Sequence, residues 1–166
     1  MIPTAPDAHP STPPAPPSQD ESDISIPPGV EHVRVLHDAA ETAGRLGLIE
    51  ETVTPAFDGP PLHVHPDFDE LFYVLDGELT FQVEDEVRRV RPGETVFAVR
   101  GTRHTFANHS DAAARVLIAV TPAGFERYFG LLQARLAGTE PRGEYHGPRP
   151  VTEIVGAPIA RAPTPS

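Results

Sequence analysis

The 166-residue sequence contains no cysteine, no lysine and no tryptophan, and its single methionine is residue 1. All 13 basic residues are therefore arginines. Without cysteine the chain cannot form disulfides, bind zinc or iron–sulfur clusters through thiolates, or use a thiol nucleophile. Without lysine it cannot be a Schiff-base enzyme or use a P-loop that relies on its lysine. Catalytic groups are thus limited to His, Asp, Glu, Arg, Tyr and hydroxyls.

Positive charge is also scarce, because the formal net charge is −11. Nucleic acids and anionic membranes both require a positive patch, so the sequence predicts neither as a partner. No apolar run reaches the 18 residues of a membrane span, and no basic segment precedes an apolar one as in a secretory signal. We therefore expect a cytoplasmic protein.

Proline is abundant but unevenly placed. Nine of the 21 prolines fall in residues 1–28 and six in residues 138–166. Segments of this composition cannot bury enough apolar surface to order themselves. We predict a disordered Pro-rich arm over 1–28 and a Pro-rich tail over 138–166, in which 151–155 adds a short strand or lies on the surface of the domain between them.

The middle of the chain has the two-residue period and the regular turn signals of an all-β barrel or sandwich. Asp76-Gly77 lies between two such runs and predicts a type I′ hairpin, and Pro92-Gly93 predicts a further turn. Strands are expected over 32–37, 45–54, 62–65, 71–75, 78–84, 86–90, 95–99, 103–108 and 115–121.

A helix is expected after the last strand, over 123–137. Phe125, Phe129, Leu132 and Leu136 recur at three- and four-residue steps, and Gly138 provides a stop. Such a stripe is typical of a helix that packs on a core, so we expect it to cover the barrel and not to serve catalysis.

One group of histidines stands apart from the others. His63 and His65 project from the same face of a strand, and the break at Pro66 resets the register so that Glu70 can point to the same side. His104 is the fourth candidate, on a separate strand. Three imidazoles and one carboxylate suit a first-row divalent transition metal, with open positions for a substrate, O₂ or water.

These residues resemble the two motifs of the cupin superfamily. Gly59 to Gly77 is similar to G(x)5HxH(x)4E(x)6G, and Gly93 to Asn108 is similar to G(x)5PxG(x)2H(x)3N. Two positions depart from the motifs: Gly59 precedes the HxH by three residues instead of five, and Val99 replaces a proline. Neither is a ligand position, so the departures bear on turn geometry more than on metal binding.

The resemblance implies a short antiparallel jelly-roll barrel over 29–122 that forms a homodimer. It also implies one divalent ion, Fe, Mn, Ni, Co, Cu or Zn, held by His63, His65, Glu70 and His104. Cupins include enzymes, regulators and storage proteins, so the fold alone does not give the chemistry.

Strand parity predicts what lines the site. Phe72 shares the parity of Glu70, while Phe106 and Asn108 share that of His104, so these three are the predicted substrate-binding residues. Phe68, Phe81 and Phe97 are candidates for further apolar lining. Arg100 and Arg103 are expected to face solvent. An apolar lining favours a hydrophobic, aromatic small molecule over an anionic one.

Within the superfamily the chain resembles small bacterial cupins grouped with quercetinase-like flavonol dioxygenases. The leading hypothesis is a metal-dependent dioxygenase acting on an enolic or phenolic aromatic substrate, in which Glu70 is also the catalytic base. Two alternatives stay open: a non-catalytic cupin that binds a small molecule, and an isomerase or cyclase that does not use O₂.

Overall fold

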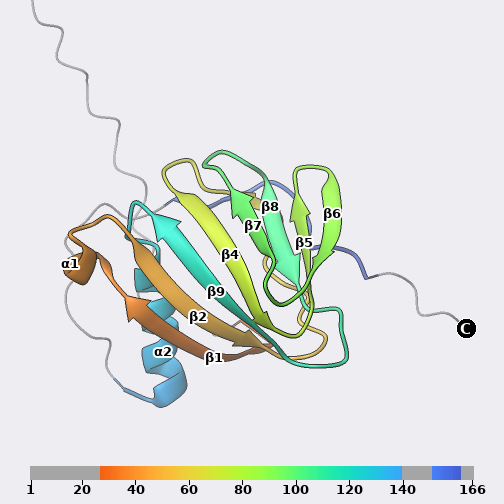
Figure 1. The fold of residues 1–166 in the computed structure, drawn as a ribbon, viewed down its shortest axis with the longest axis horizontal. Coiled ribbons are helices and arrows are strands. Elements are labelled where there is room, and N and C mark those ends of the chain that lie inside the picture. The colour runs from red at the N-terminus through yellow and green to blue at the C-terminus, as the bar shows by residue number, and fades with distance from the viewer. Residues whose placement is uncertain (1–26, 140–150, 162–166) are drawn as a thin grey trace, which may run out of the picture.

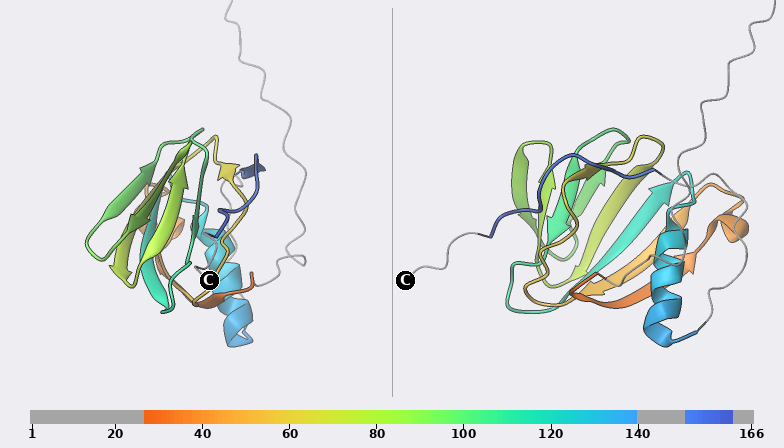
Figure 2. Two further views of the ribbon diagram at one scale, coloured as in Figure 1. Left: turned by 90° about the vertical axis from the view of Figure 1, so that its right-hand side faces the viewer. Right: turned by 180° about the vertical axis from the view of Figure 1, so that it is seen from behind.

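The computed structural model describes residues 27–139 and 151–161. Two five-stranded antiparallel sheets face each other within them (Figures 1 and 2). Residues 1–26 of the predicted arm, and residues 140–150 and 162–166 of the predicted tail, lie outside the described residues. The elements are β1 (Val30–His37), α1 (Ala39–Thr42), β2 (Gly47–Val53), β3 (His63–Val64), β4 (Asp69–Asp76), β5 (Leu79–Val83), β6 (Glu86–Val90), β7 (Thr95–Ala98), β8 (His104–Ala107), β9 (Ala114–Thr121), α2 (Glu126–Ala137) and β10 (Glu153–Ile154).

The strand order is β1-β2-β9-β4-β7 in one sheet and β10-β3-β8-β5-β6 in the other. This is the double-sheet arrangement of a jelly roll, in which the chain repeatedly crosses between the sheets. Hydrogen bonds do not close the two sheets into one continuous barrel within the described residues. The all-β jelly-roll prediction is confirmed, and each of the nine predicted strands is present with its ends within two residues of the expected positions.

The predicted hairpin at Asp76-Gly77 is wrong. β4 and β5 belong to different sheets, so the turn between them carries the chain across the sandwich. Only Gly77 has positive φ, at 75°, whereas a type I′ turn requires positive φ at both positions. A Cβ on Gly77 would come within 2.7 Å of the Ala113 carbonyl oxygen, so this corner needs glycine for close approach as well.

The C-terminal helix α2 packs against β1 and β2, behind the sheet as seen in Figure 1. It begins at Glu126, three residues later than predicted, and ends at Ala137, where the C-cap Gly138, with a φ of 62°, confirms the predicted stop. The short helix α1 was not predicted, because its four residues bury no side chain and show no apolar stripe. No helix in the described part of the chain is long and apolar enough to span a membrane.

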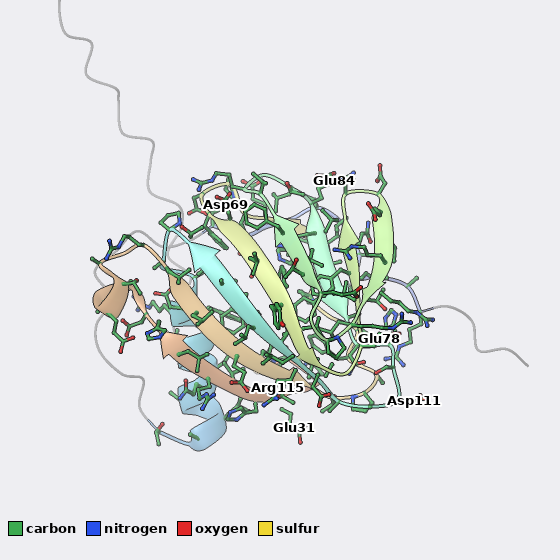
Figure 3. All side chains as sticks on the ribbon, viewed as in Figure 1. Glu31, Asp69, Glu78, Glu84, Asp111 and Arg115 are labelled. Atoms are coloured by element: carbon green, nitrogen blue, oxygen red, sulfur yellow. The ribbon has the colours of Figure 1, made fainter. Side chains whose placement is uncertain are left out.

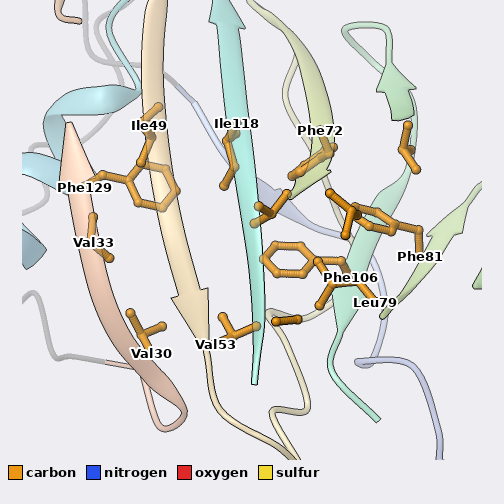
Figure 4. Close-up of a cluster of buried hydrophobic side chains, with 14 of the residues drawn as sticks. Val30, Val33, Ile49, Val53, Phe72, Leu79, Phe81, Phe106, Ile118 and Phe129 are labelled. Atoms are coloured by element: carbon orange, nitrogen blue, oxygen red, sulfur yellow. The ribbon is translucent and has the colours of Figure 1, made fainter. Parts of the chain in front are cut away.

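The core lies between the sheets and under α2 (Figure 4). Inward-facing positions of β4 and β9 alternate with outward ones, as half-buried strands require. Phe72, Phe81 and Phe106 form an aromatic cluster with ring centroids 5.0 to 5.7 Å apart. Charged side chains such as Asp69, Glu78 and Glu84 lie around the periphery (Figure 3).

Candidate metal centre

The four predicted metal ligands converge at one point between the sheets. His63 lies on β3, His65 follows that strand, Glu70 lies on β4 and His104 on β8. One ligand atom from each can be chosen so that all four lie within 4.8 Å of one another. All four residues are buried. The structure thus brings together in space the set that the spacing predicted.

Strand pairing explains this convergence. His63 and His104 are direct partners in the β3–β8 pair, and their rings are 4.5 Å apart. Glu70 comes from the opposite sheet, where its Oε2 lies 3.0 Å from His104 Nε2 and 3.5 Å from His65 Nε2. The His65 carbonyl accepts a hydrogen bond from Gly101, which anchors the chain where it leaves β3. The site therefore joins the two sheets.

Each of the three imidazoles is oriented by a backbone carbonyl at its Nδ1 atom. The contacts are His63 to Pro61 at 2.7 Å, His65 to Val151 at 3.1 Å and His104 to Thr102 at 2.9 Å. Since a carbonyl can only accept, each Nδ1 must carry the proton, and each Nε2 lone pair is left for a metal.

One further observation supports a transition metal at this set of donor atoms. His65 Nε2 is buried and has no hydrogen-bond partner among the described residues. A buried acceptor that has no hydrogen-bond partner and lies 3.5 Å from a carboxylate oxygen is costly unless an ion completes it. His63, His65, Glu70 and His104 would hold that ion, and the geometry does not distinguish among the candidate metals.

The site shifts the pKa values of its ligand residues in different directions. Burial raises the pKa of Glu70, but its contacts with His104 and His65 outweigh burial and lower the pKa to about 2. Burial and the neighbouring His104 lower the pKa of His63 to about 4. Burial also opposes the charged form of His104, yet its hydrogen bond to Glu70 raises its pKa. Protonation of His104 therefore competes with metal binding, which weakens in acid.

Aromatic rings pack directly against the ligand residues. Phe68 stacks on His65 at 4.2 Å, and Phe125 lies 4.9 Å from both rings. Phe125 is the N-cap residue of α2, so the expectation that this helix only covers the barrel is incomplete: its first turn also contacts a ligand imidazole.

The other predicted lining residues occupy three different environments. Phe72 and Phe106 are buried, and Phe72 contacts the His104 ring at 6.2 Å. Phe97 is 53% exposed and lies on the outer face, so its assignment to the lining is wrong. The Asn108 amide donates to Thr54 and Ala112, and its oxygen accepts from Ser110. These contacts leave little of the Asn108 side chain for a ligand. Substrate binding by Asn108 is not tested by the structure and stays a prediction.

The two nearby arginines face solvent, as expected. Arg100 pairs with Asp69 at 2.9 Å and Arg103 with Glu84 at 2.8 Å. Neither arginine is turned toward the four ligand residues. The site therefore has no cationic contact for an anionic substrate from these side chains.

The C-terminal segment supports the site in a way the sequence did not indicate. β10 pairs with β3, which confirms the short strand expected in 151–155 (Figure 2, left). Val151 O and Thr152 Oγ1 both lie 3.1 Å from His65 Nδ1. No local pattern reveals such a contact, because 86 residues separate Val151 from His65.

A second buried acid, Glu51, was also not predicted from the sequence. It occupies an inward position of β2 and is only 3% exposed. Burial, with a further effect from Glu70, raises its pKa to about 8. The sequence around Glu51 carries no signal for this environment. The neighbouring Glu50 is also a glutamate, and it points to the opposite side of the sheet, where it pairs with Arg34.

This protonation makes a testable contribution to stability. The folded protein holds a proton on Glu51 that the unfolded chain releases near pH 4.5, so the stability from this group falls as pH rises from 4.5 to about 8. We expect Glu51→Gln to be increasingly more stable than wild type across that window in urea titrations. A constant offset in the free energy of unfolding between Glu51→Gln and wild type would contradict the assignment.

The fold and the site define a double-sheet β protein with a centre of three histidines and one glutamate. Residues 49–120 match the Cupin_2 family, described as the cupin domain. The tetracenomycin polyketide synthase protein TcmJ of Streptomyces glaucescens is 35% identical over 85 residues, 49% of this chain and 52% of TcmJ. The match thus spans about half the length of that curated relative.

Solved structures support the same fold. KdgF from Halomonas sp. has a TM-score of 0.52 at 20% identity and covers 60% of this chain and 84% of its own. The protein TT1209 from Thermus thermophilus has a TM-score of 0.51 at 24% identity, with 63% and 95% covered. Residues 49–120, which match the cupin domain, thus lie in a fold that these solved structures share.

Proposed function

We propose that the protein is a metal-dependent cupin dioxygenase that acts on an enolic or phenolic aromatic substrate. The observation that carries this proposal is a cluster of three imidazoles and one carboxylate whose ligand atoms lie within 4.8 Å of one another, buried against aromatic rings. A bound divalent transition metal would supply Lewis acidity toward an enol or phenol oxygen and, for a redox-active ion, an electron-transfer partner for O₂.

The surrounding residues then bind the substrate and move its proton. Phe68 and Phe125 offer ring faces beside His65, and Phe72 lies beside His104, so a planar aromatic molecule gains apolar contact on both sides of the centre. Glu70 is ionised at neutral pH and hydrogen-bonded to His104, which makes it the acceptor for the substrate hydroxyl proton.

The test is oxygen consumption by protein loaded in turn with Fe²⁺, Mn²⁺, Co²⁺, Ni²⁺, Cu²⁺ and Zn²⁺ and offered a flavonol. We expect turnover with at least one redox-active ion and none with Zn²⁺. Glu70→Gln should abolish turnover. Binding of the flavonol without turnover under any ion would instead support a non-catalytic ligand-binding cupin.

A second candidate is an isomerase or cyclase that needs no O₂. The relative named as a polyketide synthase protein favours it, because polyketides carry enolic oxygens and rearrange by proton transfer. Glu70 would again move the proton. Conversion of a polyketide-type substrate under anaerobic conditions would establish this chemistry, and a strict O₂ requirement would exclude it.

We also propose a homodimer, in the cytoplasm. Leu71 and Phe97 are direct partners on the outer face of β4 and β7, where they are 37% and 53% exposed, beside Tyr73. A continuous apolar strip of this kind is typical of an interface. We expect Phe97→Glu to convert a dimer to a monomer in light scattering, while Val87→Glu, on β6 of the other sheet, leaves the mass unchanged. Equal masses for wild type and Phe97→Glu would contradict this interface.

A further inference from the structure

The turn that joins β7 to β8 contacts two of the four ligand residues. It runs from Val99 to Thr102 and is closed by a hydrogen bond of 2.9 Å from Thr102 N to Val99 O, with Gly101 at a φ of 79°. Gly101 N donates to the His65 carbonyl at 2.8 Å, and the Thr102 carbonyl accepts from His104 Nδ1 at 2.9 Å. This turn therefore fixes the backbone of one ligand residue and the ring orientation of another.

Packing does not hold the turn in place. Val99 is 51% exposed, and Arg100 and Gly101 are exposed as well. A Cβ added at Gly101 would meet no atom within 4 Å, so nothing packs against the turn at that point. Loops with few buried apolar contacts are among the least stable parts of a fold, whereas metal ligands must be held closely in position. The turn therefore needs another anchor.

The carboxylate of Asp69 provides that anchor. It accepts three hydrogen bonds from Arg100: from the backbone N at 2.8 Å, from Nε at 3.0 Å and from Nη2 at 2.9 Å. Asp69 is the first residue of β4, which has β9 on one side and β7 on the other. An arginine fork on a carboxylate fixes direction as well as distance. The ion pair thus ties an exposed turn to the interior of a sheet.

Asp69 is also the chain neighbour of the ligand Glu70. Glu70 Oε2 lies 3.0 Å from His104 Nε2, and the turn that Asp69 anchors accepts from the other ring nitrogen of His104. Two consecutive residues of β4 therefore act on the two ends of one imidazole. Loss of the ion pair between Asp69 and Arg100 would leave the Nδ1 end without a fixed partner.

We propose that Asp69 and Arg100 are positioning residues of the metal centre, whose ion pair holds the turn over 99–102 so that His65 and His104 present their Nε2 atoms to the ion. The inference rests on the metal centre of the proposed function, and not on its substrate or on O₂. Outer partners of metal ligands typically contribute 10- to 100-fold in metal affinity, whereas ordinary exposed ion pairs contribute little to stability.

Two substitutions separate positioning from simple charge. Asp69→Ala removes a negative charge close to the ligands, and Arg100→Ala removes a positive one. By charge alone the first would weaken Zn²⁺ binding and the second would strengthen it. If the pair positions the ligands, both weaken it. Competition against a chelating dye gives the zinc constants.

We expect Asp69→Ala, which loses all three hydrogen bonds, to weaken Zn²⁺ binding about tenfold or more. Arg100→Ala keeps the backbone N–H and should lose less, about threefold to tenfold. The double variant should bind no more weakly than Asp69→Ala, since both changes remove the same interaction.

The matched controls are Glu78→Ala and Arg91→Ala. These residues form an ion pair of 3.0 Å, and Glu78 follows the end of β4 that is far from Asp69 (Figure 3). The controls make the same two charge changes without touching the turn, so their zinc constants should equal that of wild type.

The visible spectrum of Co²⁺-loaded protein provides a second readout, because its bands report the geometry at the ion and not the stability of the fold. We expect the bands of Asp69→Ala and Arg100→Ala to differ from wild type, and those of both controls to match it. Arg100→Lys keeps the charge but not the fork, so its spectrum should also differ.

Three results would overturn the inference and leave the proposed function intact. Stronger zinc binding by Arg100→Ala would show an effect of charge alone. Unchanged zinc constants in both variants would remove the pair from the centre. Weaker zinc binding with a wild-type cobalt spectrum and a lower melting temperature of the metal-free protein would assign the pair to fold stability.

The proposed function fails separately. If wild type bound neither Zn²⁺ nor Co²⁺, the metal centre, the proposed function and this inference would fall together. If metal-loaded wild type gave the expected variant series but no turnover of a flavonol, the positioning role would stand and the dioxygenase proposal alone would fall.

Discussion

Glu70→Ala is expected to lower the affinity for Zn²⁺ by about 100-fold or more. Glu70 is the only anionic member of the ligand set, and its carboxylate lies 3.0 Å from His104 Nε2 and 3.5 Å from His65 Nε2. Loss of a direct ligand should exceed the 10- to 100-fold cost of losing an outer partner. Competition against a chelating dye measures the constant directly.

Glu86→Ala is the control for this experiment. Glu86 is exposed on β6, at the hairpin that joins β5 to β6, and lies away from the centre. It should bind Zn²⁺ with the wild-type constant. If Glu70→Ala, correctly folded by circular dichroism, bound as tightly as Glu86→Ala, Glu70 would not be a ligand.

Removal of residues 151–166 is expected to weaken Zn²⁺ binding by about 10- to 100-fold, although no ligand is deleted. The shortened chain lacks Val151 O and Thr152 Oγ1, which hold His65 Nδ1. It also lacks the backbone of Gly156, which donates to Leu62 next to the ligand His63. The His65 ring then loses both its orientation and its fixed tautomer.

A chain that ends after Arg161 is the matched control, because it keeps every one of these contacts. Its zinc constant should equal that of wild type. Thr152→Val removes only the hydroxyl contact, so its zinc affinity should lie between those of the chains that end at residues 150 and 161. Unchanged affinity in the chain that ends at residue 150 would show that β3 alone orients His65.

Much of the fold could be predicted because its signals are local. Strands with one buried face alternate in sequence, as in β4 and β9, and the nine predicted strands follow from such alternation or from short β-branched runs between turn residues. The pairing of strands is not local. Asp76-Gly77 has the composition of a hairpin turn, but the chain uses Gly77 to cross between sheets, and only the tertiary structure decides between the two outcomes.

The candidate site likewise combines residues that could be predicted from the sequence with residues that could not. His63, His65, Glu70 and His104 could be identified because ligand residues need particular chemistry at particular spacing. Glu51 could not, since nothing beside it in the sequence shows that it faces the interior of the sandwich while Glu50 pairs with Arg34. Support from Val151 depends on contacts across 86 residues. Supporting contacts come from the whole fold, whereas ligands come from two short motifs.

The most direct test of the metal centre is a crystal structure of the protein loaded with one equivalent of Co²⁺ or Zn²⁺, with anomalous data collected at the metal edge. We predict one peak per chain, about 2.0–2.2 Å from the Nε2 atoms of His63, His65 and His104 and from a carboxylate oxygen of Glu70. A peak bound through Nδ1, a peak elsewhere, or a stoichiometric complex in which any of the four residues stays unligated would contradict it.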